Sequence, residues 1–114
     1  MSDYKVFRLK DVNLDFPDGA DVGSNLVRYV DETHSQHLGA GVFRVHGISN
    51  ELVLPYDEAC VCLQGTLKLT LEGEQVDLAV GDAAWIPKGT RAVFSGDNAV
   101  AFYGIYPVDW RSKS

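Results

Sequence analysis

The sequence predicts an all-β domain, either a sandwich or a small barrel, and three observations lead to this prediction. Apolar and polar residues alternate in many short runs, no segment keeps a helical period of about 3.6 residues, and Gly or Pro interrupts the runs at short intervals. Many short strands with regular turns are typical of sandwiches and small barrels. With 114 residues, the chain has the length of a single domain over residues 1–114.

Each expected strand is an apolar or alternating run bounded by turn residues. The clearest alternation is at 66–71, and Glu72-Gly73-Glu74 after it is expected to form a hairpin turn. The runs at 59–63 and 99–106 are apolar on both faces, which indicates central strands or a subunit interface. The first run is expected to be an edge strand or to be exchanged with a partner. In order, the strands are predicted at 5–9, 25–30, 41–46, 51–54, 58–63, 66–71, 75–79, 83–86, 91–95 and 99–106.

The composition argues against several classes of partner. Ten Lys and Arg residues against sixteen Asp and Glu residues give a formal charge of −6 and a pI near 4.8, so neither a nucleic acid nor a membrane surface is expected as a partner. No apolar run approaches the roughly 20 residues of a membrane span, and no secretory signal is visible. Cys60 and Cys62 are expected to be reduced core thiols of a cytoplasmic protein.

Two glycine spacings carry a resemblance to a known family. Six residues separate Glu58 from Gly65, and Gly81 is followed by five residues, Pro87, one residue and Gly89. Glycine permits turn conformations that a side chain blocks, and proline fixes a bend at the end of a strand. In this order, the spacings resemble the two sequence motifs of the cupin superfamily. The resemblance implies a single-domain cupin: a small double-stranded β-helix, or jelly-roll barrel, of two antiparallel sheets.

More narrowly, residues 39–110 resemble the cupin domain of the EutQ family of ethanolamine-utilisation proteins. Tyr56-Asp57-Glu58 and Ile86-Pro87-Lys88-Gly89 are the more specific matches. EutQ proteins carry a long region before the cupin, whereas about 38 residues precede the matching stretch here, so the chain looks like a stand-alone EutQ-like cupin. The other matching residues are Gly39-Ala40-Gly41, Leu63-Gln64-Gly65, Glu72-Gly73-Glu74, Gly81-Asp82, Phe94, Tyr103, Pro107 and Trp110.

The resemblance raises the question of a metal. Typical cupins hold a divalent metal through histidines and one glutamate, which suit Fe, Mn, Ni or Zn. Here the histidine positions of the motifs fall on Leu52, Leu54 and Ala92, or with the longer allowed gap on Glu51 and Val53. Glu58 remains, and one carboxylate does not hold a transition metal. EutQ cupins also lack these histidines, so we expect no metal and no other cofactor.

Without a metal, Glu58 and Tyr56 are the candidate catalytic residues. Glu58 occupies an inward position of its motif, and an unpaired carboxylate in an apolar barrel has a raised pKa that suits acid–base catalysis. Tyr56 precedes it by two residues and shares its face in a regular strand. A structural interpretation stays open for both residues. Glu58 can form a buried pair with Arg44, Arg91 or a tyrosine hydroxyl, and the Tyr56 hydroxyl can lie in water at the rim.

Further residues are expected to line the pocket, and each has a simpler interpretation. The facing of the strand at 41–46 stays open, because its other alternating face, which is apolar, can fill the core instead. Aromatic residues in a small barrel can belong to the hydrophobic core without contacting a ligand, and a lysine in a turn can simply be solvated. The predicted lining residues are Arg44, His46, Trp85, Tyr103 and Lys88.

Three kinds of function follow from these residues and the resemblance. The first is a metal-independent small-molecule enzyme or binding protein of amine or small-carbon catabolism that uses the barrel pocket. The second is a non-catalytic accessory or scaffold protein of a catabolic pathway or microcompartment. An acetate kinase-like activity, associated with the EutQ family, or a metal-dependent cupin with atypical ligands comes last, since the acidic chain has no phosphate loop. The expected partners are a small-molecule ligand and a second copy in a homodimer. Whether the chain is an enzyme stays open.

Overall fold

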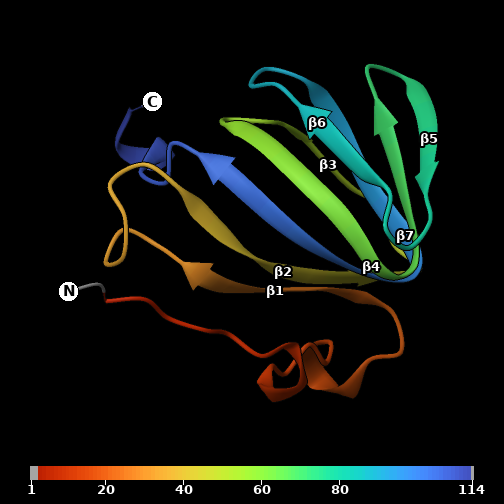
Figure 1. Cartoon of the computed structure of the whole chain (residues 1–114). Helices are drawn as coiled ribbons and strands as arrows, with labels where there is room; N and C mark the ends of the chain where they lie inside the picture. Colours follow the sequence, from red (N-terminus) through yellow and green to blue (C-terminus); the bar gives the residue numbers. More distant parts are fainter. Residues whose placement is uncertain (1–2, 114) are drawn as a thin grey trace.

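The structure is a computed structural model that describes residues 3–113. Its strands form one antiparallel sheet in the order β1-β2-β7-β4-β5, with β3 paired to β7 and β6 paired to β4 (Figure 1). The sheet folds into two layers that enclose the core, which confirms the predicted all-β cupin barrel. The strands are β1 (Gly23–Val30), β2 (Gly39–His46), β3 (Asn50–Val53), β4 (Asp57–Leu71), β5 (Glu74–Leu78), β6 (Ala83–Ile86) and β7 (Arg91–Tyr106).

Strands β4 and β7 are long, bend sharply and belong to both layers. The first half of β4 pairs with β6 and with the second half of β7, whereas its second half pairs with β5 and with the first half of β7. The bend in β4 coincides with two register shifts between Cys62 and Thr66. The prediction that each long strand is two separate strands is therefore wrong, because backbone pairing continues around the corner.

Gly65 makes this corner possible. Its φ is +66°, which a residue with a side chain rarely adopts. A Cβ at this position would lie 2.4 Å from the carbonyl oxygens of Asp97 and Asn98 on the facing strand. Gly81 also has a positive φ, of +92°, but open space around it. Both glycines therefore allow special backbone conformations as expected, and only Gly65 also meets a tight backbone contact.

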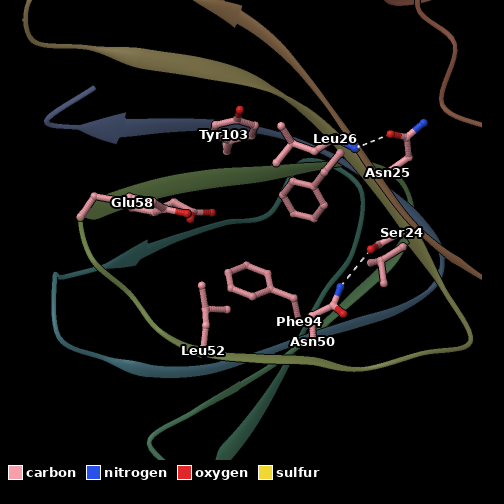
Figure 2. Close-up of a pocket in the computed structure, with 11 residues that line it drawn as sticks. Ser24, Asn25, Leu26, Asn50, Leu52, Glu58, Phe94 and Tyr103 are labelled. Atoms are coloured by element: carbon pink, nitrogen blue, oxygen red, sulfur yellow. Dashed lines mark hydrogen bonds between the residues drawn. The ribbon is translucent and has the colours of Figure 1, made fainter. Parts of the chain in front are cut away.

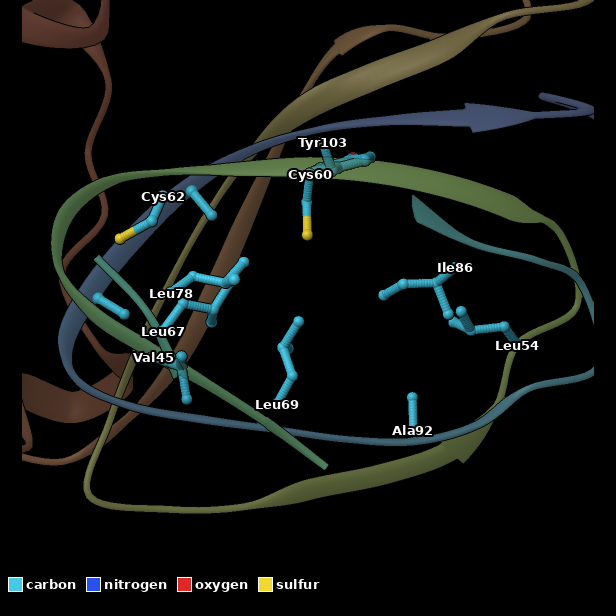
Figure 3. Packing of buried hydrophobic residues seen from close by; sticks show 12 residues of the cluster. Val45, Leu54, Cys60, Cys62, Leu67, Leu69, Leu78, Ile86, Ala92 and Tyr103 are labelled. Carbon is cyan, nitrogen blue, oxygen red and sulfur yellow. The ribbon is translucent and has the colours of Figure 1, made fainter. Parts of the chain in front are cut away.

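The core lies between the two layers (Figure 3). Leu67 and Leu69 from the second half of β4 and Ile86 from β6 are fully buried there. Burying one such side chain stabilises the fold by about 1.5–3 kcal/mol. Cys60 and Cys62 point into the same core and are free thiols, as expected. The full alternation of β4 thus places Glu58 on the same inward face.

The N-terminal segment covers the outer face of β1 and β2 (Figure 1). Leu14 and Phe16 are buried, and Phe7 stacks on Tyr29 with ring centroids 4.8 Å apart. The predicted strand at 5–9 is wrong, because this segment pairs with no strand of the described chain and instead contributes side chains to a second apolar cluster. The helical elements are 3-10 turns at η1 (Leu9–Asp11), η2 (Pro17–Gly19) and η3 (Trp110–Lys113). None of the described helices has the length and apolar character needed to cross a membrane.

Candidate functional site

A cavity of about 340 Å³ opens between β1, β2, β3, β4 and β7 (Figure 2). Its volume lies near the lower end of the range of about 300–1,000 Å³ that is typical of small-molecule sites. The side chain of Asn50 donates a hydrogen bond to the Ser24 hydroxyl, which ties β3 to β1 across the cavity. The lining residues are Ser24, Asn25, Leu26, Phe43, Val45, Asn50, Leu52, Tyr56, Glu58, Phe94 and Tyr103.

Glu58 points into this cavity from β4 and is 4% exposed (Figure 2). Its neighbours on the adjacent strands are Ile86 and Ile105, so the carboxyl group has apolar surroundings. Within residues 3–113, no side chain is recorded in a hydrogen bond or ion pair with it. Burial raises the pKa of Glu58 from 4.5 to about 7. The carboxyl group is therefore poised to exchange a proton near neutral pH.

Two of the residues considered as partners of Glu58 in a buried pair, Arg44 and Arg91, make their contacts elsewhere. Arg44 lies on the opposite face of the sheet, where its guanidinium binds the side chain of Asn98 and the carbonyl of Leu14. Arg91 is exposed, and its backbone N–H donates to the Glu72 carboxylate. No tyrosine hydroxyl is recorded as a partner of Glu58 among the described residues. Within the part of the chain that the structure describes, no hydrogen bond or ion pair compensates the burial of this carboxyl group.

Two tyrosines share the cavity with Glu58. Burial, assisted by the nearby Glu58 and Tyr103, raises the pKa of Tyr56 to about 12. Burial is also the main cause that raises the pKa of Tyr103, with a smaller opposing effect from Arg28. Both hydroxyl groups therefore stay protonated near neutral pH and can donate hydrogen bonds to a ligand.

Local packing positions these rings. The Tyr56 ring meets Trp110 of η3 edge-on, with centroids 5.4 Å apart. Gly41 on β2 lies beside Tyr103, and a Cβ there would come within 2.7 Å of the Tyr103 hydroxyl oxygen. The glycine in β2 thus leaves the space that the tyrosine occupies. The sequence motif Gly39-Ala40-Gly41 therefore shapes the pocket, which was not visible from spacing alone.

Arg44 and His46 do not line the cavity, and the prediction that they do is corrected. Phe43 and Val45 take the inward face of β2, while the Arg44 guanidinium lies 4.1 Å from the Phe16 ring on the outer face. His46 accepts a hydrogen bond of 2.8 Å from the backbone N–H of Asn98. The reason is that Phe43 and Val45 pack in the core, which leaves Arg44 and His46 on the outer face, where the N-terminal segment meets Arg44 through Leu14 and Phe16.

Trp85 and Lys88 also lie outside the cavity. Trp85 is 64% exposed on the outer face of β6, because the inward positions of that strand are Ala84 and Ile86. Lys88 is exposed in the turn after β6, where its backbone N–H donates to the Asp57 carboxylate. Their predicted role in lining the pocket is therefore corrected, whereas Tyr56, Glu58 and Tyr103 lie together in it as predicted.

Sequence reasoning missed most of the rim. Ser24 and Leu26 lie on the inward face of β1, and Asn50 and Leu52 on that of β3. Phe94 meets Phe43 edge-on inside the cavity, with centroids 5.9 Å apart. The period-2 alternation in each strand was the available signal, but it identifies a face without saying whether that face is inward.

The residues present do not fit a cupin metal centre. Leu54 and Ala92 are fully buried apolar residues of the interior, and Leu52 lines the cavity. In the part of the chain that the structure describes, no three His, Cys, Asp or Glu side chains gather closely enough to hold a metal ion. Among the described residues that line the cavity, Glu58 supplies the one ligand of the type that the fold family uses. We therefore derive no chemistry through a metal.

Comparison with known proteins identifies the family. The model of the family "Ethanolamine utilisation protein EutQ" matches residues 4–112. A curated relative from Clostridioides difficile, named acetate kinase EutQ, is 35% identical over 81 residues, which are 70% of this chain and 52% of the relative. The chain thus spans about half the length of that relative.

Solved structures agree with this assignment. The structure of the Clostridium difficile EutQ protein has a TM-score of 0.81 at 27% identity, covering 96% of this chain and 84% of that one. An RmlC-like cupin with a double-stranded β-helix fold, from Methanocaldococcus jannaschii, has a TM-score of 0.67 at 15% identity over 87% and 93% of the two chains, and it shows the fold alone. The chain therefore belongs to the EutQ family of ethanolamine utilisation proteins and has the cupin fold.

Proposed function

We propose that this chain is a metal-independent small-molecule binding protein or enzyme of amine or small-carbon catabolism, acting in the cytoplasm through the barrel cavity. The observation that carries the proposal is the buried Glu58 carboxyl group, which has no partner within residues 3–113 and lies in a cavity of about 340 Å³. A buried ionisable group without a partner costs stability, and such costs are typical of functional sites. Membership of the EutQ family supports a role in amine or small-carbon catabolism. The two free thiols support a location in the cytoplasm, where thiols stay reduced.

The cavity offers a simple division of chemical roles. With a pKa of about 7, Glu58 can accept a proton from a ligand or return one near neutral pH. Tyr56 and Tyr103 remain neutral hydrogen-bond donors that orient a polar ligand atom. The apolar rings of Phe43 and Phe94 form part of the wall of the same space. This arrangement suits proton transfer or plain binding, and neither needs a metal.

The ligand response of a Glu58→Gln variant tests this proposal. Gln keeps the shape of the side chain but removes its charge and its titratable proton. In thermal melts with a panel of small amines, acids and aldehydes, we expect at least one class to raise the Tm of the parent protein and to lose that effect in the variant. Glu51→Gln, which alters an exposed carboxylate on β3, serves as the control and should keep the response.

Two other outcomes of the same melts lead to the alternative functions. A parent protein that responds to no ligand class would instead favour a non-catalytic accessory or scaffold role in the pathway. The name of the curated relatives makes an acetate kinase-like activity a further alternative. A nucleotide with magnesium should then raise the Tm, and acetate should be phosphorylated by the purified chain.

A second copy of the chain is the protein partner that we propose. Trp85 on β6 and Phe102 and Tyr106 on β7 are 64%, 39% and 55% exposed on the outer face of one layer. Ala59 and Val61 lie between them on β4, so the apolar surface continues across three paired strands. An apolar face of this kind can meet its own copy about a two-fold axis, which is the commonest way in which soluble chains pair.

Sedimentation velocity at micromolar concentration tests the homodimer. We expect a dimer for the parent protein and a monomer for Trp85→Glu, because a buried charge at the centre of the face would remain unpaired. Val53→Glu is the matched control, since Val53 is 59% exposed on β3 of the other layer. A parent protein that sediments as a monomer would contradict the proposed dimer.

A further inference from the structure

We propose that the barrel cavity takes an organic ammonium ion, with the Glu58 carboxylate as its counter-ion and aromatic rings as its walls. This inference rests on the proposed function of the cavity and names the class of ligand.

The charged group that lines the cavity is a carboxylate. Among the described residues that line it, Glu58 is the ionisable carboxylate, and there is no Lys, Arg or His. The other polar lining groups are neutral hydroxyls and amides. A buried carboxylate that lacks a counter-ion within the described chain gains most from a ligand that brings a positive charge. An anionic ligand would face like charge at the same place.

Aromatic rings form much of the cavity wall. Four aromatic residues, Phe43, Tyr56, Phe94 and Tyr103, line the cavity together with Glu58. Phe43 lies 5.9 Å from Phe94 and 6.2 Å from Tyr103 between ring centroids, so three of the rings form one cluster. Figure 2 shows Glu58 and the labelled Tyr103 and Phe94 around the same space. Aromatic faces around a desolvated cation are a recognised way of binding alkylated ammonium groups.

The arginines nearby belong to a different hollow. Arg28 of β1 and Arg111 of η3 line a small recess that also contains Asp31 and Glu32. Tyr103 lines both this recess and the main cavity, so its ring lies between the two. The arginine charges therefore have acidic residues in their own recess and do not line the space that Glu58 faces.

The affinity of the cavity for a cation should depend on pH. A bound cation stabilises the ionised carboxylate, so affinity should follow the ionisation of Glu58, whose pKa is about 7. Its ionisable neighbours do not titrate in this range: burial raises the pKa values of Tyr56 and Cys60 to about 12 and that of Tyr103 above its usual 10. The other charged groups that act on these two tyrosines are Arg28 and Arg111. The affinity for a permanent cation should thus rise about tenfold from pH 6 to pH 8 and then level off.

Three probes of nearly equal size and shape test the inference. Choline is a permanent cation, 3,3-dimethylbutan-1-ol is its neutral isostere, and 3,3-dimethylbutanoate is an anion of similar size. In NMR titrations of the whole chain at millimolar ligand, we expect choline to bind at least about tenfold more tightly than the alcohol, and the anion to bind most weakly. Glu58→Gln should abolish the preference for choline and its pH dependence, whereas Glu51→Gln should keep both.

A second variant keeps the test informative if Glu58→Gln folds poorly. Phe94→Leu removes one aromatic face and should weaken choline several-fold while changing the neutral alcohol little. Equal binding of choline and the alcohol, or a preference for the anion, would overturn the ammonium inference and leave the cavity as a ligand site. Absence of binding by all three probes, together with an empty thermal screen, would overturn the proposed function as well.

Discussion

Replacing Glu58 by Gln is expected to stabilise the fold by about 3 kcal/mol at pH 8 and by less than about 1 kcal/mol at pH 5. The carboxyl group has a pKa of about 7 in the folded chain against a usual value of 4.5. One pKa unit corresponds to about 1.4 kcal/mol, which sets the size of the effect. The physical cause is burial of a charge that has apolar neighbours and no partner among the described residues.

The direction of the pH dependence follows from proton binding. Between pH 4.5 and about 7, the folded chain holds the Glu58 proton more tightly than the unfolded chain does. The free energy of unfolding therefore falls as the pH rises through this window and is constant on either side, as far as this group is concerned. Glu58 thus lowers the free energy of unfolding by its full amount above neutral pH and does not lower it at low pH.

Urea denaturation followed by circular dichroism at pH 5, 6, 7 and 8 measures this dependence. The parent protein should lose stability across the series, and the difference between Glu58→Gln and the parent should grow from below about 1 kcal/mol at pH 5 to about 3 kcal/mol at pH 8. Glu51→Gln, on the exposed side of β3, should follow the parent. A Glu58→Gln variant that is less stable than the parent at pH 8 would mean that the carboxylate makes a stabilising contact.

Gly65→Ala is expected to destabilise the fold by about 3 kcal/mol or more. A φ of +66° costs an alanine about 1–2 kcal/mol of backbone strain. The added Cβ would also lie 2.4 Å from two carbonyl oxygens of the facing strand, and backbone atoms move aside less easily than side chains. Overpacking of this kind adds about 1–3 kcal/mol, so the two effects together are large.

Gly73→Ala separates the two causes. Gly73 has a φ of +83° in the hairpin between β4 and β5, but no atom lies within 4 Å of the position of its Cβ. It should therefore lose about 1–2 kcal/mol, from strain alone. Urea midpoints of both variants and of the parent give the comparison. Equal losses for Gly65→Ala and Gly73→Ala would show that the contact at the β4 corner relaxes at little cost.

The sequence predicts where strands lie better than it predicts which neighbouring strands are one continuous strand. Alternation predicted every core strand to within a few residues, because the period-2 pattern comes directly from burial on one face. It could not join the halves of β4 and β7, since Gly65 and Asn98, the latter with a φ of +48°, look like turn residues. Whether such residues end a strand or bend it depends on pairing with a distant segment, which a local pattern does not contain.

The same limit explains what was right and wrong about the candidate site. Glu58, Tyr56 and Tyr103 were placed in the pocket by the motif and its neighbouring strand positions, and they lie there. Arg44 and His46 could not be assigned a face, because both faces of β2 are covered, one by the core and one by the N-terminal segment. Arg44 takes the outer face, where its guanidinium lies over the ring of Phe16. Because Phe16 is distant in the sequence, the local pattern of β2 does not reveal this contact.

The shared strands β4 and β7 also bear on how the chain can fold. Asp57 at the start of β4 pairs with Tyr106 at the end of β7, and Leu71 at its other end pairs with Ala92. Because these partners are distant in sequence, a large loop must close before much stabilising contact forms, and such topologies fold slowly. Each half of the barrel takes strands from both segments, so neither half can exist as an independent subdomain. A split of the chain into two complementing fragments is therefore better tolerated at the β4–β5 hairpin, whose tip is exposed, than at the corner of β4.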